Sequence, residues 1–248
     1  MKNFAVIQHN YSEFLGLIEH QLEVRDIGFS YFRPFVDQAL PASPLPFDAL
    51  FVLGGDWPVE GNHEQAQRFA SEKALIANFL NAKRPVIGIG LGGQLVAEYA
   101  GARSQEKELH NAYWTTAHVT ELGKEDALAK AVDGKRVMVL HRGKTELPDE
   151  LAPIVVDDEG QWLAIRAHHL AYGMLFRPEL KPGMLEDMIM EAGRVVPDNI
   201  SELLSEARNE WAATQKNTDQ ITIALVSTLD LMKERRKPPV IRLNVEPE

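Results

Sequence analysis

One stretch of the chain constrains the fold more than any other. Residues 85–94 read PVIGIGLGGQ, an apolar run that passes directly into closely spaced glycines. A short run that is apolar at successive positions is typical of a strand buried on both faces, as in a parallel sheet. The glycines indicate a tight turn, and the residues from Gln94 to Ala100 have the pattern of a helix. The stretch therefore predicts a strand, a turn and a helix in succession.

The preceding residues show the same alternation of strand and helix patterns. Compact apolar runs that predict strands lie at 4–7, 29–32 and 49–53. Apolar residues at helical spacing predict helices over 12–25, capped by Ser12, and over 64–82. Strands that alternate with helices are the pattern of a doubly wound sheet. We therefore expect an α/β fold, a three-layer α/β/α sandwich with a mainly parallel central sheet.

The pattern changes after Gly101. Short β runs follow without long helices between them, at 113–119, 136–140, 154–156, 162–166 and 171–176. We expect these runs to extend the sheet. The last part of the chain has helical patterns at 183–192, 200–211 and 221–235, which define a helical C-terminal part, 183–236. Because neither an internal repeat nor a low-complexity linker separates these parts, we expect a single domain over residues 1–248.

The composition excludes several classes of chemistry. The chain contains no cysteine, so disulfides, cysteine-ligated metal centres and a thiolate nucleophile are all impossible. The 26 basic and 36 acidic residues give a net charge of −10, which argues against nucleic acid or an anionic membrane as a partner. The longest apolar runs fall far short of the roughly 20 residues that cross a bilayer. We therefore expect a cytoplasmic protein with no metal site and no cofactor.

The glycines of the first stretch also match a nucleotide-binding pattern. Gly88, Gly90 and Gly93 have the G-x-G-x-x-G spacing that lets a pyrophosphate approach a helix N-terminus. That pattern belongs in the first strand–helix unit of such folds, whereas here it follows the fourth predicted strand. The next segment, 104–111, is polar and is not a strand that ends in an acid. A dinucleotide-dependent oxidoreductase is therefore a minor alternative.

Three motifs of the chain occur in the same order in one enzyme family. Residues 88–94, GIGLGGQ, have the form of a nucleophile elbow and are similar to G-I-C-L-G-x-Q. Residues 52–55, VLGG, are similar to an oxyanion loop, and residues 172–179, YGMLFRPE, to Y-G-x-Q-F-H-P-E. On these motifs the chain resembles the class I glutamine amidotransferases, specifically the stand-alone GMP-synthase-like group. The resemblance covers nearly the whole chain and implies a flavodoxin-like α/β fold.

The resemblance assigns catalytic positions that this chain does not fill. In the family an elbow cysteine attacks the glutamine amide, a histidine handles the proton and an acid orients the histidine. The cysteine position is Gly90, the histidine position is Arg177, and only the acid, Glu179, is kept. Glycine cannot form a glutamyl thioester, and arginine stays protonated and cannot act as a general base. We therefore expect that the usual cysteine–histidine–glutamate chemistry is lost.

The remaining matching positions are those of the family's oxyanion hole and glutamine site. The resemblance implies that Gly54 and Gly55 supply backbone N–H groups to a tetrahedral intermediate. Leu91 and Gln94 match positions that line the glutamine site. The structural alternative is that Leu91 only packs in the core and that Gln94 is an ordinary residue of the first helical turn.

Two interpretations of Arg177 follow from the missing cysteine. An elbow residue has a strained backbone, which glycine accepts at little cost, so a chain that no longer needs the nucleophile can carry Gly90. In the first interpretation Arg177 and Glu179 form an ion pair across the vacated pocket. In the second, Arg177 lies with the amides of Gly54 and Gly55 at a helix N-terminus and binds an anion or a carboxylate.

The sequence thus predicts a pseudo-glutaminase that binds a small ligand or a partner protein. The alternative is an active glutamine amidotransferase that uses a modified site. The resemblance implies glutamine, or another small carboxylate, as the ligand. It also implies a synthetase partner in trans, because the family passes ammonia to a synthetase and this chain leaves no room for one.

Overall fold

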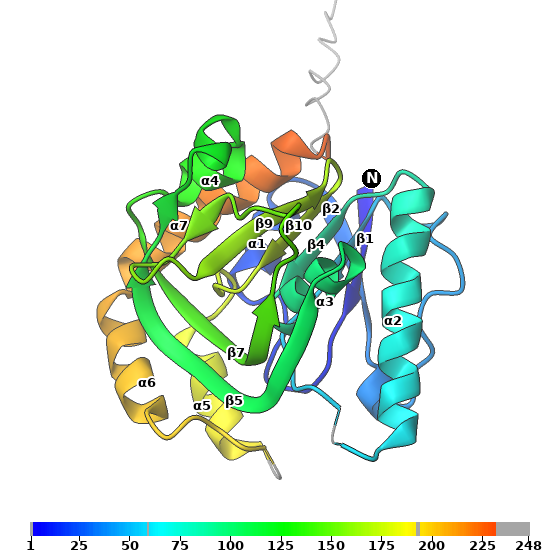
Figure 1. The fold of residues 1–248 in the computed structure, drawn as a ribbon, viewed down its shortest axis with the longest axis horizontal. Helices are drawn as coiled ribbons and strands as arrows, with labels where there is room; N and C mark the ends of the chain where they lie inside the picture. Colours follow the sequence, from blue (N-terminus) through cyan, green and yellow to red (C-terminus); the bar gives the residue numbers. More distant parts are fainter. Residues whose placement is uncertain (1, 59, 192–193, 232–248) are drawn as a thin grey trace, which may run out of the picture.

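One sheet separates two layers of helices in the structure, a computed structural model that describes residues 2–58, 60–191 and 194–231 (Figure 1). Eight strands of the described residues form this sheet in the order β2-β1-β3-β4-β10-β9-β8-β6. Their bounds are Lys2–Ile7 (β1), Ile27–Phe32 (β2), Ala49–Val52 (β3), Val86–Ile89 (β4), His118–Val119 (β6), Val155–Val156 (β8), Trp162–His168 (β9) and Ala171–Met174 (β10). The five strands from β2 to β10 are parallel, and the other three continue the sheet antiparallel. The expected three-layer α/β/α sandwich with a mainly parallel sheet is confirmed.

The strands bury both of their faces, as the sequence predicted. On β1, Phe4 and Val6 belong to one apolar cluster, whereas Ala5 and Ile7 belong to another, because successive side chains of a strand point to opposite faces. The first cluster contains residues of α1 (Leu17–Glu23), α4 (Ala127–Val132) and α7 (Trp211–Thr228). The second contains residues of α2 (His63–Asn81) and α3 (Leu91–Tyr99). Each helical layer therefore has its own core.

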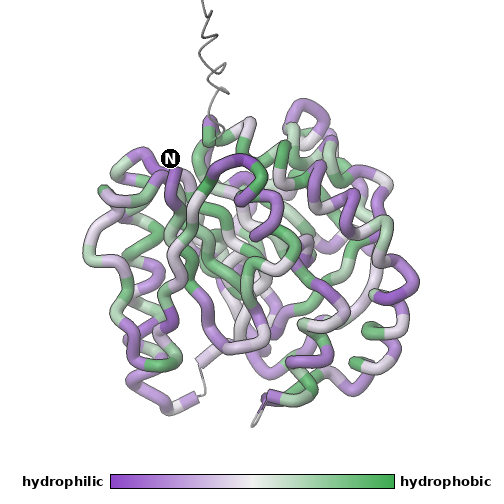
Figure 2. The backbone as a smooth tube through the Cα atoms, turned by 180° about the vertical axis from the view of Figure 1, so that it is seen from behind, coloured by the Kyte–Doolittle hydropathy of each residue, from purple (hydrophilic) through white to green (hydrophobic). Residues whose placement is uncertain are grey.

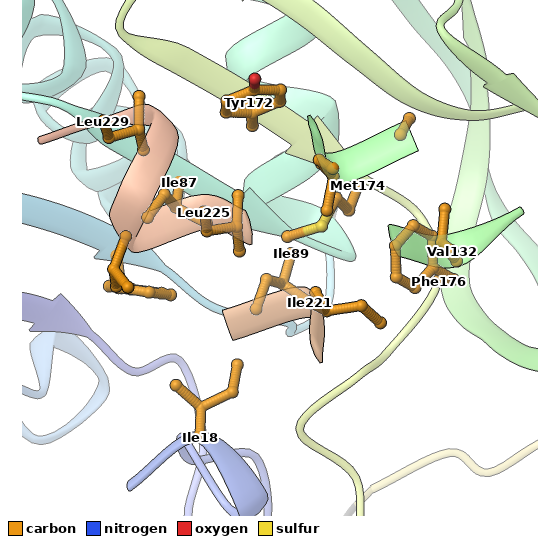
Figure 3. Packing of buried hydrophobic residues seen from close by; sticks show 14 of the residues in the cluster. Ile18, Ile87, Ile89, Val132, Tyr172, Met174, Phe176, Ile221, Leu225 and Leu229 are labelled. Atoms are coloured by element: carbon orange, nitrogen blue, oxygen red, sulfur yellow. The ribbon is translucent and has the colours of Figure 1, made fainter. Parts of the chain in front are cut away.

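The core on the α7 side joins distant parts of the chain. Figure 3 shows Ile221 and Leu225 of α7 near Ile87 and Ile89 of β4. All four side chains are buried, and burial of one such side chain stabilises the fold by about 1.5–3 kcal/mol. The tube in Figure 2 shows the same distribution, with hydrophobic segments gathered in the central strands. The C-terminal helices are thus an integral part of the sheet's cover.

Two of the predicted strands do not extend the main sheet. β5 (Arg103–Thr116) and β7 (Arg136–Glu146) pair only with each other, as a separate antiparallel sheet. A single bridge between Val139 and Phe176 connects β7 to the segment that follows β10. Met138 and Leu140 of β7 pack against α5 (Pro182–Met190) and α6 (Ile200–Asn209) instead of against a helix of the sandwich. The expectation of one continuous sheet was wrong here, because these strands have their own apolar cover.

The first helix begins later than the sequence predicted. Ser12 does not cap it; its hydroxyl donates to Glu191 at 2.6 Å. The helix begins at Leu17, whose N–H donates to the carbonyl of Glu179 at 2.9 Å. The preceding residue, Gly16, has a φ of +52°, and a Cβ there would lie 2.1 Å from the same carbonyl oxygen. Contact with the distant Glu179 segment therefore decides where this helix starts.

Helices occupy much of the C-terminal part predicted as helical, 183–236, of which residues 192–193 and 232–236 lie outside the described part. Its three helices are α5, α6 and α7. The last helix begins at Trp211 rather than at Ile221. Thr218 is the buried residue of this polar stretch, and its hydroxyl donates to the carbonyl of Pro178 at 2.6 Å. Two short 3₁₀ turns, Pro34–Val36 and Leu122–Glu125, complete the described elements.

Candidate functional site

The turn between β4 and α3 has the geometry of a nucleophile elbow. Gly90 stands between the strand and the helix with φ +58° and ψ −117°, a conformation that strains any residue with a Cβ. Its N–H donates to the carbonyl of Met174 at 2.8 Å. The predicted strained backbone at Gly90 is confirmed. The turn therefore keeps the form that presents a nucleophile, although the residue presented has no side chain.

The other glycines of this stretch are required by close packing. A Cβ at Gly92 would lie 1.9 Å from the carbonyl oxygen of Val52, and one at Gly93 would lie 2.3 Å from that of Met174. A Cβ at Gly88 would lie 2.2 Å from the carbonyl oxygen of Gly92. These distances are far below van der Waals contact. Any residue with a Cβ at these three positions would therefore push α3 away from the sheet. The G-x-G-x-x-G spacing thus has a complete explanation in helix–sheet packing, without a nucleotide.

The loop after β3 brings Gly54 and Gly55 to the elbow. A Cβ at Gly54 would lie 2.5 Å from Arg177 Nη2, and an ideal Cβ at Gly90 would lie 3.4 Å from the Cα of Gly54. A Cβ at Gly55 would lie 2.5 Å from the Cβ of His9. Both glycines are therefore needed for the loop to approach its neighbours. The structure places the predicted oxyanion loop beside the predicted nucleophile position.

Arg177 lies over Gly90 and fills the space beside it. The Cδ and Nη1 atoms of Arg177 are 3.4 and 3.5 Å from the point where a Cβ of residue 90 would be. Arg177 Nε donates to Glu179 at 2.6 Å, and Nη1 donates to Glu13 at 2.7 Å and to the carbonyl of Leu140 at 2.9 Å. The predicted ion pair between Arg177 and Glu179 is confirmed. The guanidinium is thus neutralised by residues of the chain itself.

Glu13 connects Arg177 to a second arginine. Its other carboxylate oxygen accepts a hydrogen bond from Arg194 Nη2 at 2.8 Å and another from the Asn10 amide. The side chains of Arg177, Glu13 and Glu179 are at most 2% exposed, and that of Arg194 is 10% exposed. We call Gly90, Arg177, Glu179, Glu13 and Arg194 the elbow cluster. Paired charges that are buried to this degree hold one another in place strongly.

The protonation states of the cluster follow from burial and pairing. Burial by itself raises the pKa of Glu13, but Arg194 and Arg177 outweigh it and hold that pKa well below its usual range. Burial lowers the pKa of Arg177, yet Glu179 and Glu13 raise it overall. Burial raises the pKa of Glu179, and Arg177 offsets this only in part. Arg177 is therefore a permanent cation and cannot accept a proton from a nucleophile.

The two predicted ligand-lining residues have different surroundings. Leu91 is 1% exposed and belongs to the apolar cluster beneath α2 and α3, as in the structural alternative. Gln94 is fully buried, and its Nε2 donates to the Thr145 hydroxyl at 3.0 Å. Within the described part of the chain, Gln94 Oε1 has no hydrogen-bond partner. Gln94 is therefore the one residue of the pair that keeps a free acceptor atom near the elbow.

Sequence reasoning missed three residues near the elbow: Glu13, Arg194 and His141. Glu13 was taken as part of a helix, and Arg194 follows a segment without a motif. His141 is buried, and burial together with the nearby Arg177 lowers its pKa to about 4. A signal for Glu13 existed, because an arginine at a buried motif position requires acids around it. The sequence does not say which of its 36 acids supply them.

In the ranges 2–58, 60–191 and 194–231, no three histidine, aspartate or glutamate side chains converge as a metal ion would require. Within the same ranges, no helix has the length and apolar character needed to span a membrane.

The fold and the site define a class of protein: an α/β sandwich with a nucleophile elbow, an adjacent glycine loop and a facing acid. A model of the family "Glutamine amidotransferase class-I" matches residues 6–195. The chain belongs to the class I glutamine amidotransferase family. The chain contains no cysteine, and the buried side chain of Arg177 lies against Gly90 at the elbow.

Known relatives and structures agree with this assignment. The glutamine amidotransferase-like protein YfeJ of Salmonella typhimurium is 29% identical over 199 residues, which are 77% of this chain and 82% of YfeJ. A glutamine amidotransferase from Thermotoga maritima superposes with a TM-score of 0.74 at 18% identity, over 92% of this chain and 98% of that one. One from Methylobacillus flagellatus gives 0.73 at 20%, over 96% and 98%. At these identities the two structures establish the shared fold.

Proposed function

We propose that this chain is a pseudo-glutaminase, a member of the family that does not hydrolyse glutamine by the cysteine–histidine–glutamate route and acts by binding. One observation carries the proposal: the side chain of Arg177 lies against Gly90 and is neutralised there by Glu13 and Glu179. A nucleophile is missing from the elbow, and a permanent cation stands where the family has its base. Loss of one member of such a triad already costs several orders of magnitude in rate.

The same geometry bears on the two interpretations of Arg177. Carboxylates of Glu13 and Glu179 already bind Nη1 and Nε, and only Nη2 has no hydrogen-bond partner within the described residues. The side chain of Arg177 is 1% exposed. The proposal therefore takes Arg177 as a structural plug of the former nucleophile pocket, rather than as the anchor of a carboxylate ligand.

The proposal keeps two roles for the protein that the family resemblance suggests. A small ligand such as glutamine binds near Gln94 and the Gly54–Gly55 loop without being turned over. A synthetase-type partner in trans, as for the GMP-synthase-like group, recognises the chain as a binding subunit. A cytoplasmic location belongs to the same proposal and is tested by fractionation of cells.

Release of glutamate and ammonia from L-glutamine tests the proposal. The chain as given is compared with Gly90→Cys and with Gly90→Cys combined with Arg177→His. An ideal Cβ at Gly90 makes its nearest contacts at 3.4 Å, so a cysteine fits, although φ +58° strains it. Gly134→Cys is the matched control, because Gly134 has φ +65° and open space around its Cβ position. We expect the given chain and the control to equal the buffer.

The double variant separates loss of the triad from loss of the whole pocket. Glutamate release by the double variant alone means that the oxyanion loop and glutamine site survive and that only the two residues were lost. A silent double variant means that the glutamine pocket as a whole is lost, and not only the two residues. Release by the given chain above the buffer rate contradicts the proposal and favours the alternative, an active amidotransferase with a modified site.

A further inference from the structure

A cavity of about 410 Å³ lies on the far side of the Gly54–Gly55 loop from the elbow. Its walls include His9, Asp56, Trp57, Phe69, Glu72 and Arg142. None of the predicted site residues, from Gly54 to Glu179, lines it. Small-molecule sites in proteins measure about 300–1,000 Å³, whereas two other cavities of this structure measure about 30 and 20 Å³, room for one or two waters. This cavity has the size of a ligand site.

The topology of the sheet places this cavity where α/β folds bind ligands. The strand order begins β2-β1-β3-β4, so the chain moves outward from β1 in one direction to β2 and in the other to β3. His9 follows β1, and Asp56 and Trp57 follow β3. In doubly wound sheets ligands bind at the carboxyl ends of the strands where the order reverses, which for this order is between β1 and β3. We call the cavity the switch-point cavity.

One wall of the switch-point cavity is a buried pair of charges. His9 lies 2.8 Å from Glu72 through Nε2 and 2.9 Å from the carbonyl oxygen of Gly54 through Nδ1. Both partners accept hydrogen bonds, so both ring nitrogens donate and His9 is an imidazolium. Glu72 comes from α2, which runs beside β1 (Figure 1). This pair neutralises itself and fixes the Gly54 carbonyl at the edge of the cavity.

The arginines on the cavity wall are also occupied by acids. Arg68 donates to Asp37 at 2.9 Å and to Glu64 at 2.7 Å. Arg142 donates to Glu108 through Nη2, while its Nη1 is 3.7 Å from the carboxylate of Asp56, longer than a hydrogen bond. Asp56 is thus the acid of the wall with the weakest compensation. Burial raises the pKa of Asp56, and Arg142 and Arg194 offset this only in part.

Aromatic rings form the apolar part of the cavity. Trp57 and Phe69 lie 5.9 Å apart between ring centroids. The indole N–H of Trp57 donates to the carbonyl of Arg142 at 3.0 Å, which holds the ring in place. The ammonium of Lys107 lies 5.1 Å from the centroid of the same indole, so this ring already accepts a cation of the chain itself.

We infer that the switch-point cavity binds a small organic cation, an ammonium or guanidinium group carried on an apolar body, with the cation at Asp56 and the body against Trp57 and Phe69. The cationic group gives Asp56 a second cation besides Arg142, whose Nη1 lies 3.7 Å from the carboxylate. The flat or aliphatic body covers the rings and displaces water from them. The inference does not depend on the proposed function, because it concerns a different cavity and involves the elbow cluster only through the charges of Arg194 and Glu13 near Asp56.

The test uses three probes that share a phenylethyl body and differ in charge: 2-phenylethylammonium, 2-phenylethanol and 3-phenylpropionate. Binding to the full chain is measured by calorimetry and by the indole N–H signals in nuclear magnetic resonance spectra. The chain has four tryptophans, 57, 114, 162 and 211, and Trp57→Phe assigns the signal of the first. We expect the ammonium probe to bind and to shift the Trp57 signal alone.

Two variants locate the charge that the probe recognises. Asp56→Asn keeps the size of the side chain and removes its charge, and we expect the affinity for 2-phenylethylammonium to fall about tenfold. Asp149→Asn removes the same charge from an exposed residue away from the cavity and should leave the affinity unchanged. Equal binding of the neutral or anionic probe, equal binding to Asp56→Asn, or no binding of the ammonium probe overturns the inference. None of these outcomes bears on glutamine turnover.

Discussion

Two places on the same edge of the sheet differ in what fills them. At the end of β4, the elbow cluster is filled by one arginine, Arg177, and two glutamates, Glu13 and Glu179, whose side chains are at most 2% exposed. Between the ends of β1 and β3, the switch-point cavity leaves about 410 Å³ open. Side chains of the chain itself fill the space beside Gly90, whereas the neighbouring position is open. The Gly54–Gly55 loop separates the two.

The difference between the two places lies in how their buried charges are balanced. The family's elbow needs space for a thiolate and a substrate, and a buried arginine needs acids around it. Glu13 and Glu179 supply those acids from both sides of Arg177. The charges around the switch-point cavity are paired differently. His9 is paired with Glu72 at 2.8 Å, whereas Asp56 lies 3.7 Å from Arg142, beyond hydrogen-bond distance. We therefore expect substitutions in the elbow cluster to change mainly the free energy of unfolding. Substitutions in the switch-point cavity should change mainly the affinity for a ligand.

The largest expected effect is a loss of stability when one carboxylate is removed from the elbow cluster. Glu13→Gln leaves Arg177 with one carboxylate and Arg194 without its best partner, so the free energy of unfolding should fall by about 3–5 kcal/mol, as for other broken buried ion pairs. Urea unfolding followed by circular dichroism measures it. The matched control is Glu23→Gln on the exposed side of α1, for which we expect less than about 0.5 kcal/mol. A loss below about 1 kcal/mol for Glu13→Gln would show that the cluster is not what holds the elbow closed.

A second prediction concerns acid pH at the elbow. The pKa of His141 is lowered to about 4 by burial and by Arg177, so between pH 6.5 and 4 the unfolded chain binds a proton that the folded chain does not. Stability should therefore fall on acidification, by about 2 kcal/mol from pH 7 to pH 5 for this residue. His141→Gln should remove that part of the slope when both proteins are unfolded by urea at each pH. Parallel slopes for the two proteins would contradict the prediction, since groups such as Glu179 titrate equally in both.

A third prediction measures how tightly the space over Gly90 is filled. Gly90→Ala adds a Cβ that meets Arg177 at 3.4 Å, in ordinary contact, but at φ +58°. We expect a loss of about 1–2 kcal/mol from backbone strain alone. Gly134→Ala also lies at a positive φ, +65°, with open space around the added Cβ, so its loss in thermal or urea unfolding gives the effect of a positive φ without a neighbouring side chain. A much larger loss at Gly90 would mean that Arg177 cannot adjust at all.

The smallest expected effect belongs to the cavity and has the opposite sign in pH. Burial by itself lowers the pKa of His9, but Glu72 outweighs it and the pKa is raised. The stability that His9 contributes is therefore complete below its unfolded pKa and is lost as the pH rises through the folded pKa. The destabilisation of His9→Gln should be larger at pH 6 than at pH 9, by on the order of 1 kcal/mol. An equal loss at both values would show that His9 is neutral in the folded chain.

Much of the fold was predictable because local patterns agree with the tertiary structure. Continuous apolar runs identified β1, β3 and β4 within a residue or two, since strands of a parallel sheet are buried on both faces. The predictions were wrong where a contact between residues distant in the sequence determines the local structure. The start of the first helix depends on the carbonyl of Glu179, and β5 and β7 leave the main sheet because α5 and α6 cover them. Neither contact leaves a local signal.

The candidate site divides in the same way. By itself, the sequence determined that a cysteine nucleophile is absent and that an arginine and a glutamate lie two residues apart in the family's final motif. It also indicated a strained turn at Gly90. Only the tertiary structure decided that Arg177 lies over that turn, that Glu13 and Arg194 complete its charges, and that a cavity opens between β1 and β3. The reason is physical: absence of an atom type is a property of composition, whereas charge balance and open volume depend on which segments the fold brings within a few ångströms.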